Sequence, residues 1–350
     1  MQQVTERLSN VQIEIFDVGH GQCAVATAPN GNRLMLDCGT RWRDDRFWTP
    51  SLHFFKERFE MLALLNLDED HLADFGQVME HCTVPWVLSN PTVGHAQFHA
   101  LKTSGMGRGA QAVAKWLAAP KALNGLLPQP DFGQVQVRWY YNHHTPGWQT
   151  NDLSLVVVLQ FGLFKIMFAG DLERKGWRQL LQLADFRNDL LGTNIFVASH
   201  HGRESGCCED LFYYFTPEIV IISDDEKQHQ SQETNAWYRQ RCSGASVIAN
   251  PSERRYVMTT RNDGCLRINA NASGLWRLDP FNVEDWPRTP KASPLGALNA
   301  FTNPLGATTI ADILRAPPPR QNSLTDLPRL ANPLSPGSDF NSLLRYLAPR

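Results

Sequence analysis

Hydrophobic and polar residues alternate in short runs near the start of the chain. Residues 11–18 alternate with the period of a half-buried strand, and two further apolar runs follow at 23–28 and 33–39. Residues 29–32, with the sequence PNGN, have the composition of a hairpin turn. The pattern therefore predicts three neighbouring strands, and the third has an acidic end at Asp37.

Apolar runs then alternate with segments of helical period. Strands are expected at 61–65 and 84–89, from Trp139 onward, from Asn194, and in a hairpin over 153–170; helices are expected at 71–81, 110–118, 177–183 and 234–242. Hairpins mixed with strand–helix units favour a layered α/β sandwich. The apolar run 153–170 contains Gln160, Gly162 and Lys165, so it is interpreted as two buried strands and not as a membrane span.

Composition and charge narrow the functional classes. The chain has 350 residues, 42% of them hydrophobic and 19% charged, as in ordinary globular proteins. A net charge of −2 gives no global electrostatic case for binding nucleic acid. Residues 1–10 lack the form of a signal peptide, and the seven cysteines include no Cys-x-x-Cys pair, which fits reduced thiols in a cytoplasm.

The amino-acid composition of the chain changes after residue 286. The last segment is rich in proline, so the sequence predicts a domain over 1–286 and an extended tail over 287–350. This tail is interpreted either as a docking segment for a protein partner or as an inert extension. Residues 104–109 are glycine-rich but lack the Gly-Lys-Ser/Thr ending of a phosphate loop, and a flexible loop near the mouth of the active site is expected there.

Metal-binding residue types follow three of the predicted strands. The run 61–65 is followed by Asn66-Leu67-Asp68-Glu69-Asp70-His71, and the later strands end in Gly170-Asp171 and His200-His201-Gly202. Carboxylates and imidazoles are the common ligands of divalent metal ions in proteins. Three strands that each end in Asp or His indicate one polar site along one edge of a buried sheet.

Taken in order, these segments resemble the metallo-β-lactamase superfamily, and within it the hydrolase domain of ComEC-type competence proteins. The resemblance extends from about Val11 to Asp279 and rests on seven short matches. The matching segments are DVGHGQ at 17–22, DCG at 37–39, NLDEDH at 66–71, NDLS at 151–154, GD at 170–171, HHG at 200–202 and QHQSQE at 228–233. The resemblance implies an αββα sandwich and a centre of one or two divalent ions, with Zn²⁺ or Mn²⁺ favoured and Mg²⁺ also compatible with the Asp-rich ligands.

The resemblance also implies roles for individual residues. The metal ligands expected from it are Asp68, Asp70, His71, Asp171 and His201. Asp37 falls at the carboxylate that orients a histidine ligand, and Asp70, His200 and His229 are the catalytic candidates. Arg203 is expected to contact a phosphate oxygen. Asn66 and Asn151 stand where the superfamily has histidines, so one ion is poorly supplied with nitrogen ligands.

The function expected from the resemblance is metal-dependent hydrolysis of phosphodiester bonds. In that superfamily a hydroxide shared by two metal ions attacks a phosphoryl or acyl centre. The leading hypothesis is a cytoplasmic nuclease, with nucleic acid as substrate and no membrane association, which works with a protein partner in a larger system such as bacterial defence. Two alternatives stay open. One is a degenerate scaffold or binding subunit of the same fold, and the other is a small-molecule phosphoesterase.

Overall fold

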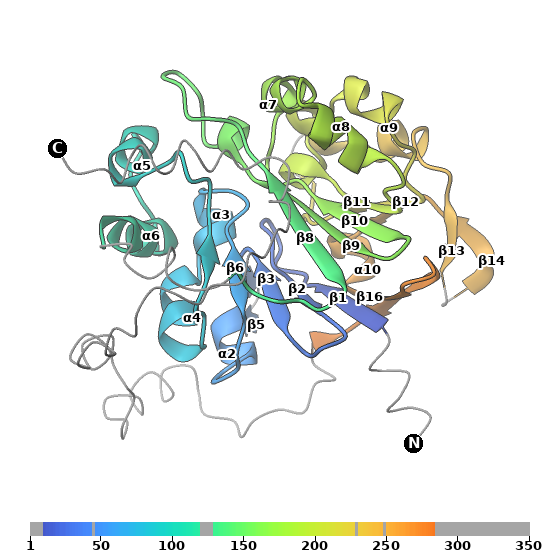
Figure 1. Ribbon diagram of the computed structural model, residues 1–350, viewed down its shortest axis with the longest axis horizontal. Coiled ribbons are helices and arrows are strands. Elements are labelled where there is room, and N and C mark those ends of the chain that lie inside the picture. The colour runs from blue at the N-terminus through green and yellow to red at the C-terminus, as the bar shows by residue number, and fades with distance from the viewer. Residues whose placement is uncertain (1–9, 44–45, 120–128, 228–229, 248–249, 284–350) are drawn as a thin grey trace, which may run out of the picture. The chain divides into compact units, whose positions relative to one another are not determined.

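The computed structural model describes residues 10–43, 46–119, 129–227, 230–247 and 250–283. Two large β-sheets and the helices around them make up this part of the chain, so the α/β class is confirmed (Figure 1). The Pro-rich segment 287–350 lies outside the described residues. None of the seven cysteines, all of which fall within the described ranges, forms a disulfide.

The first sheet has seven strands in the order β17-β16-β1-β2-β3-β6-β7. Its strands are β1 (Asn10–Ile15), β2 (Ala24–Thr27), β3 (Arg33–Leu36), β6 (Met61–Ala63), β7 (Val87–Leu88), β16 (Cys265–Asn271) and β17 (Trp276–Phe281). Pairing is antiparallel from β17 to β3 and parallel from β3 to β7. The parallel part places the carboxyl ends of β3 and β6 side by side.

The second sheet has six strands in the order β15-β12-β11-β10-β9-β8. Its strands are β8 (Val135–Tyr140), β9 (Val156–Phe161), β10 (Phe164–Phe168), β11 (Ile195–Val197), β12 (Ile219–Ile222) and β15 (Val257–Thr259). Strands β10, β11, β12 and β15 run parallel, while β8 and β9 are antiparallel to their neighbours. The hairpin predicted over 153–170 is therefore confirmed as β9 and β10. No helix in the described residues is long and apolar enough to cross a membrane.

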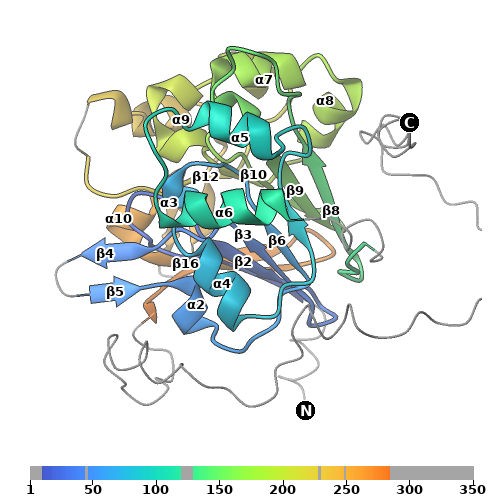
Figure 2. The same cartoon turned by 90° about the vertical axis from the view of Figure 1, so that its left-hand side faces the viewer.

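The two sheets pack face to face and helices cover their outer faces (Figure 1, Figure 2). Alternate strand residues fill the space between the sheets, among them Ile13, Leu36, Ala63, Val157, Ile166, Val197 and Ile221. The second sheet packs its other face on α7 (Arg174–Leu180), α8 (Ala184–Leu190) and α9 (Asn235–Arg239). Each fully buried Val, Ile or Phe side chain contributes about 1.5–3 kcal/mol to this core. The fold is thus a four-layer arrangement of helices, sheet, sheet and helices.

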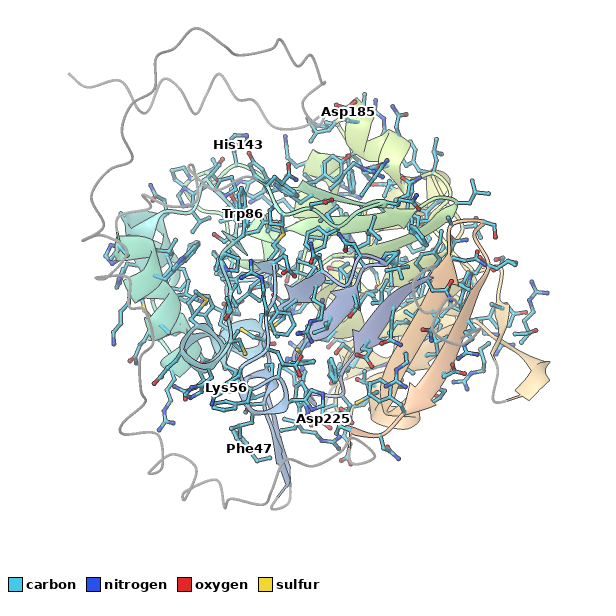
Figure 3. All side chains as sticks on the ribbon, turned by 60° about the horizontal axis from the view of Figure 1, so that its bottom comes forward. Phe47, Lys56, Trp86, His143, Asp185 and Asp225 are labelled. Atoms are coloured by element: carbon cyan, nitrogen blue, oxygen red, sulfur yellow. The ribbon has the colours of Figure 1, made fainter. Side chains whose placement is uncertain are left out.

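The first sheet is flanked by α2 (Pro50–His53), α4 (Phe75–His81) and α6 (Arg108–Ala118), and α5 (His95–Leu101) packs against α6. Phe54, at the end of α2, packs edge-to-face on Phe16 and Phe59. Two short hairpins, β4–β5 (Arg41–Arg43, Arg46–Trp48) and β13–β14 (Ala245–Val247, Asn250–Arg255), lie apart from the large sheets. Phe47 of β5 and Asp185 of α8 are exposed and lie at opposite ends of the view in Figure 3.

The helix predicted over 71–81 is wrong in its extent. The structure has two helices there, α3 (Glu69–Leu72) and α4, separated by Ala73 and Asp74. The buried Asp74 carboxylate accepts a hydrogen bond of 2.6 Å from the Ser51 backbone N–H, and its own N–H donates to the Cys38 carbonyl oxygen. These long-range hydrogen bonds replace the helical ones, so a local pattern could not reveal the break.

Asp74 gives the fold a pH dependence. Burial raises the pKa of its carboxyl group to about 6, whereas the unfolded chain titrates it near the usual value of about 3.9. Between these pKa values the folded chain holds the proton more tightly than the unfolded chain does. The stabilisation that comes from the protonated Asp74 carboxyl group is therefore lost as the pH rises to about 6. Replacing Asp74 by asparagine keeps the acceptor for Ser51 and removes the buried charge. We therefore expect Asp74→Asn to gain about 2 kcal/mol relative to the native chain between about pH 4.5 and about pH 7.5.

Urea unfolding of both proteins at the two pH values measures this difference. Carboxylates elsewhere titrate equally in the two proteins, so they cancel. A difference in the free energy of unfolding that does not change with pH would contradict the assignment to Asp74.

Candidate metal centre

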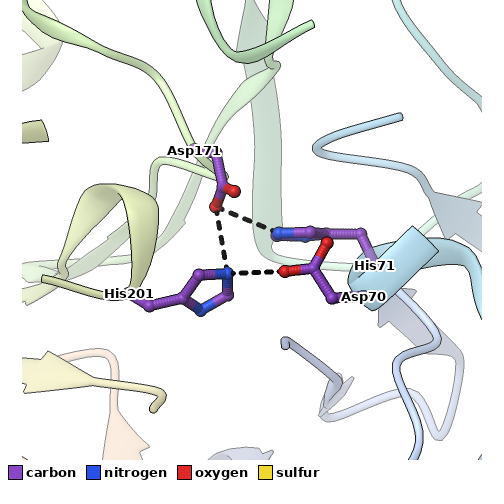
Figure 4. A group of neighbouring side chains, drawn as sticks. All are labelled: Asp70, His71, Asp171 and His201. Carbon is purple, nitrogen blue, oxygen red and sulfur yellow. Dashed lines mark hydrogen bonds and ion pairs between the residues drawn. The ribbon is translucent and has the colours of Figure 1, made fainter. Parts of the chain in front are cut away.

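Four side chains from the carboxyl ends of three strands meet at one point between the two sheets. Asp70 and His71 follow β6, Asp171 follows β10 and His201 follows β11 (Figure 4). One potential ligand atom from each lies within 4.8 Å of the others. The structure thus brings together four of the residues that the sequence analysis proposes as ligands.

The distances within the group are those of atoms directed at a shared centre. The Asp171 Oδ1 atom lies 3.0 Å from His71 Nε2 and 3.4 Å from His201 Nε2. The Asp70 Oδ2 atom lies 3.1 Å from His201 Nε2. The side chains of His71, Asp171 and His201 are at most 4% exposed, whereas that of Asp70 is 24% exposed. The group is therefore open to solvent on the side of Asp70.

Both imidazole rings are fixed by a partner on the far side from the group. His71 Nδ1 lies 2.7 Å from Asp37 Oδ2, and His201 Nδ1 lies 2.8 Å from the Ser223 carbonyl oxygen. The fully buried Asp37 also accepts a hydrogen bond of 2.6 Å from the Leu65 N–H. Because both acceptors require a proton on Nδ1, each ring presents Nε2 to the centre, as a metal ligand must.

The charges in the group stabilise one another. Burial opposes ionisation of Asp171, but His71 and His201 outweigh it and hold the pKa of Asp171 well below its usual range. Burial likewise opposes protonation of both rings, yet the surrounding carboxylates raise the pKa of His71 strongly and that of His201 to about 10. In the absence of an ion the group is a set of ion pairs, and a cation that binds must displace the histidine protons.

The donor atoms fit a divalent ion. His71 Nε2 and Asp171 Oδ1 are buried and 3.0 Å apart, yet neither makes a hydrogen bond of acceptable geometry within the described residues. Buried polar atoms without such bonds are costly, and a metal ion satisfies them. Two imidazole nitrogens and two carboxylate oxygens suit Zn²⁺, Mn²⁺ or iron. These four residues would hold the ion.

Gly21 and Gly39 are required at this site for steric reasons. A Cβ atom on Gly21 would lie 2.4 Å from the Asp70 carbonyl oxygen, and one on Gly39 would lie 2.5 Å from the same atom. The two turns after β1 and β3 therefore pack directly against the backbone of the ligand loop. Only glycine allows this approach, which fixes the position of Asp70.

The histidine loop is also held in an unusual conformation. His200 and His201 both have φ of 52°, a left-handed region that non-glycine residues rarely adopt. The His200 N–H donates to the Gly170 carbonyl oxygen at 3.0 Å, which ties the loop to the turn that carries Asp171. Backbone strain of this kind persists where the surroundings hold it in place, typically at functional sites.

The three consecutive acidic residues of the ligand loop have different partners. The Asp68 carboxylate pairs with Lys102 Nζ at 2.5 Å and accepts a hydrogen bond from Thr150 at 2.7 Å. The Glu69 carboxylate accepts hydrogen bonds from the N–H groups of Gly109 and Ala110, at the start of α6. Of the three, Asp70 alone belongs to the four-ligand group. Asp68, expected as a ligand, is thus placed with a lysine instead, and the end of the glycine-rich run binds Glu69.

Asn66 and Asn151 are hydrogen-bonded to each other. Asn66 Nδ2 donates to Asn151 Oδ1 at 2.9 Å and to Ser154 Oγ at 3.2 Å, and Asn66 Oδ1 accepts from the Asp68 N–H. Asn151 Nδ2 donates to Glu173. The two amide groups are therefore satisfied by protein partners.

His200 and Arg203 line a cleft of about 420 Å³ beside the centre, with Arg174, Glu204, Ser205 and Ser231. His200 Nδ1 lies 2.8 Å from Ser205 Oγ, and burial lowers the pKa of the His200 ring. The Arg203 guanidinium reaches to 3.5 Å from His20 Nε2. Both residues line this cleft. Their contact with a substrate stays a prediction. His229, the third catalytic candidate, lies outside the described residues.

The sequence favours a structural role for His20 in its glycine turn, with the ring near the mouth of the site, and the structure places that ring beside Asp70 and His201. Its Nε2 lies 3.4 Å from Asp70 Oδ2, its Nδ1 lies 3.3 Å from Asp224 Oδ1, and its ring centroid is 4.4 Å from that of His201. Its place in the DVGHGQ turn, next to the glycine that packs on Asp70, explains this position. Its partner Asp224 follows β12 and has no such motif.

The role of Asp37 can be tested by an isosteric change. Asp37→Asn keeps an acceptor for the Leu65 N–H but removes the negative charge beside His71. We expect the affinity for a divalent ion to fall about 10- to 100-fold, the usual effect of removing a carboxylate that orients a histidine ligand. Titration calorimetry measures it. Asp189→Asn, which removes a carboxylate paired with Arg138 on β8, is the control and should bind the ion as the native chain does; equal affinities in all three would refute the role.

No family model and no curated protein matches this chain. Among solved structures, it is similar to CmlA, a diiron β-hydroxylase from Streptomyces venezuelae, at 12% identity and a TM-score of 0.42 over 75% of this chain and 54% of that one. A mutant of CmlA gives 10% identity and a TM-score of 0.41 at the same coverage. The chain spans about half the length of these structures, and likeness at this level assigns neither a fold family nor an activity to it.

Proposed function

We propose that the chain is a metal-dependent hydrolase of phosphodiester bonds, with a site of the metallo-β-lactamase type and a resemblance to the hydrolase domain of ComEC-type proteins. The observation that carries the proposal is the group of Asp70, His71, Asp171 and His201, whose ligand atoms lie within 4.8 Å of one another. A divalent ion in such a group lowers the pKa of a water molecule and polarises a phosphoryl oxygen. The donor set supports Mn²⁺ or Zn²⁺ as that ion.

The residues around the centre have separate roles in the proposed reaction. Asp37 and the Ser223 carbonyl oxygen keep Nε2 of both histidines directed inward. Asp70, the most exposed ligand side chain, is placed to take a proton from the attacking water. His200 and Arg203 line the adjacent cleft and bind the phosphate oxygens of the substrate.

We further propose nucleic acid as the substrate and a protein partner as the source of its recognition. The net charge of −2 gives no global electrostatic attraction for a polyanion, so we propose that a partner brings the strand to the cleft. A role within a larger system, including bacterial defence, follows from the same resemblance. Strong cleavage of DNA by the purified chain alone would contradict the need for a partner.

One experiment separates this proposal from its alternatives. The purified chain is analysed for bound metal and assayed with Mn²⁺ on single- and double-stranded DNA, on RNA and on bis(p-nitrophenyl) phosphate. Metal-dependent cleavage of nucleic acid supports the nuclease. Cleavage of the small diester alone indicates a phosphoesterase. A folded protein that holds less than one ion and cleaves none of them indicates a scaffold, the alternative motivated by Asn66 and by the absence of a histidine at Asn151.

A further inference from the structure

Lys102 is a buried cation beside the centre. It lies directly after α5, its side chain is only 9% exposed, and its Nζ atom is 2.5 Å from Asp68 Oδ1 and 5.6 Å from the centre of the Phe98 ring. The other oxygen of Asp68 accepts a hydrogen bond from Thr150. Both oxygens of this carboxylate are therefore engaged by protein groups.

The remaining polar groups on this side of the site are engaged too. The Asn66 side chain, in a residue that is 1% exposed, directs its amide nitrogen to Asn151 and Ser154 and its oxygen to the Asp68 N–H. Ser154 Oγ accepts in turn from the Asp171 N–H, so this network adjoins the four-ligand group directly. In contrast to His71 and Asp171, these side chains leave no buried atom that requires an ion.

The four-ligand group and the side of the site that holds Asp68 also differ in charge. The four-ligand group carries the carboxylates of Asp70 and Asp171, with Asp37 behind His71. On the other side, the negative charge of Asp68 is neutralised by Lys102. A second divalent ion on Asp68 would share that carboxylate with an ammonium group whose side chain is only 9% exposed, and two cations at such short range repel each other.

We propose that the centre takes a single divalent ion, on Asp70, His71, Asp171 and His201, and that the Lys102 ammonium stands in the place of a second one. This inference rests on the proposed metal-dependent function and specifies its metal count. Lys102 is then a positioning residue. It fixes the Asp68 carboxylate and supplies a permanent positive charge next to the site that no chelator can remove.

The test counts ions in the full chain. Titration calorimetry with Mn²⁺, and the Mn²⁺ electron paramagnetic resonance spectrum, should give one ion per native chain with the six-line signal of an isolated ion. Lys102→Met keeps the stem against Phe98 and frees Asp68, and we expect it to bind a second, weaker ion at millimolar Mn²⁺, with a signal broadened by coupling between the ions. Lys102→Arg retains the charge and should stay at one ion.

The variant Lys102→Met/Asp68→Asn, which lacks the freed carboxylate, should return to one ion. Thermal unfolding identifies any variant that fails to fold, and Lys102→Gln then replaces Lys102→Met. Two ions in the native chain would overturn the inference and leave the hydrolase proposal intact. One ion in both the native chain and a folded Lys102→Met variant would also overturn it. No ion in the native chain would overturn the metal-dependent function itself.

Discussion

Replacing Asp171 by alanine should remove the divalent ion and, with it, hydrolysis. Asp171 Oδ1 is the oxygen that lies between both imidazole nitrogens, at 3.0 Å from His71 Nε2 and 3.4 Å from His201 Nε2. Loss of one ligand of four should weaken ion binding on the order of 10²- to 10³-fold, since a complete site contributes about 10–16 kcal/mol. We expect the metal content of the purified variant to fall to near zero and metal-dependent cleavage to fall at least as much as the affinity.

Elemental analysis and calorimetry measure the effect. Asp185→Ala, which removes an exposed carboxylate at the start of α8, is the matched control and should retain the ion (Figure 3). Asp171→Asn tests whether the loss of ion binding comes from the lost charge or from the lost side-chain volume, because asparagine keeps the volume of the buried side chain. If Asp171→Ala retained its ion while Asp68→Ala lost it, the ligand set proposed for the centre would be wrong.

Replacing Gly39 by alanine should destabilise the fold and the centre together. Its new Cβ atom would lie 2.5 Å from the Asp70 carbonyl oxygen and 2.8 Å from the Gln22 carbonyl oxygen. Both neighbours are backbone atoms, so relief requires the ligand loop or the turn after β1 to move. Overpacking of this kind costs about 1–3 kcal/mol or somewhat more. We expect a loss of about 3 kcal/mol in the free energy of unfolding and at least about a tenfold loss of metal affinity.

Gly31→Ala is the control for this second prediction. Gly31 has φ of 86° in the turn between β2 and β3, and its Cβ would meet no atom within 4 Å. Its substitution should cost only the backbone strain, about 1 kcal/mol, and leave metal affinity unchanged. Urea unfolding with and without Mn²⁺ separates the two effects. Equal behaviour of Gly31→Ala and Gly39→Ala would show that the contact with Asp70 does not position the ligand loop.

Much of the centre was visible in the sequence because its ligands follow apolar runs. Asp171 and His201 come directly after β10 and β11, and parallel neighbours in one sheet end at the same edge. The strand pattern alone therefore predicts that these two side chains meet. The layered α/β class follows from the same strands and from the helices between them.

The groups around the ligands were not visible for physical reasons. Lys102 and Thr150 reach Asp68 from segments without a periodic pattern, and they meet it only through the fold. The acceptor that orients His201 is the backbone oxygen of Ser223, which any residue type would supply. Local sequence also cannot show which of Asp68, Glu69 and Asp70 is the metal ligand, because their partners lie on different helices and loops.

The pairing of β1 with β16 has a consequence for how the chain is made. Gln12 of β1 hydrogen-bonds to Asn269 of β16 across 257 positions of sequence, and Leu266 and Ile268 belong to the core between the sheets. The edge of β1 that faces β16 thus stays unpaired until the chain has been synthesised as far as β16, at residues 265–271. Contacts of such long range slow folding, and unpaired edges invite aggregation in the meantime. A chain that stops before residue 265 should accumulate as insoluble material, and protection by a chaperone during synthesis should increase the yield of the full-length protein.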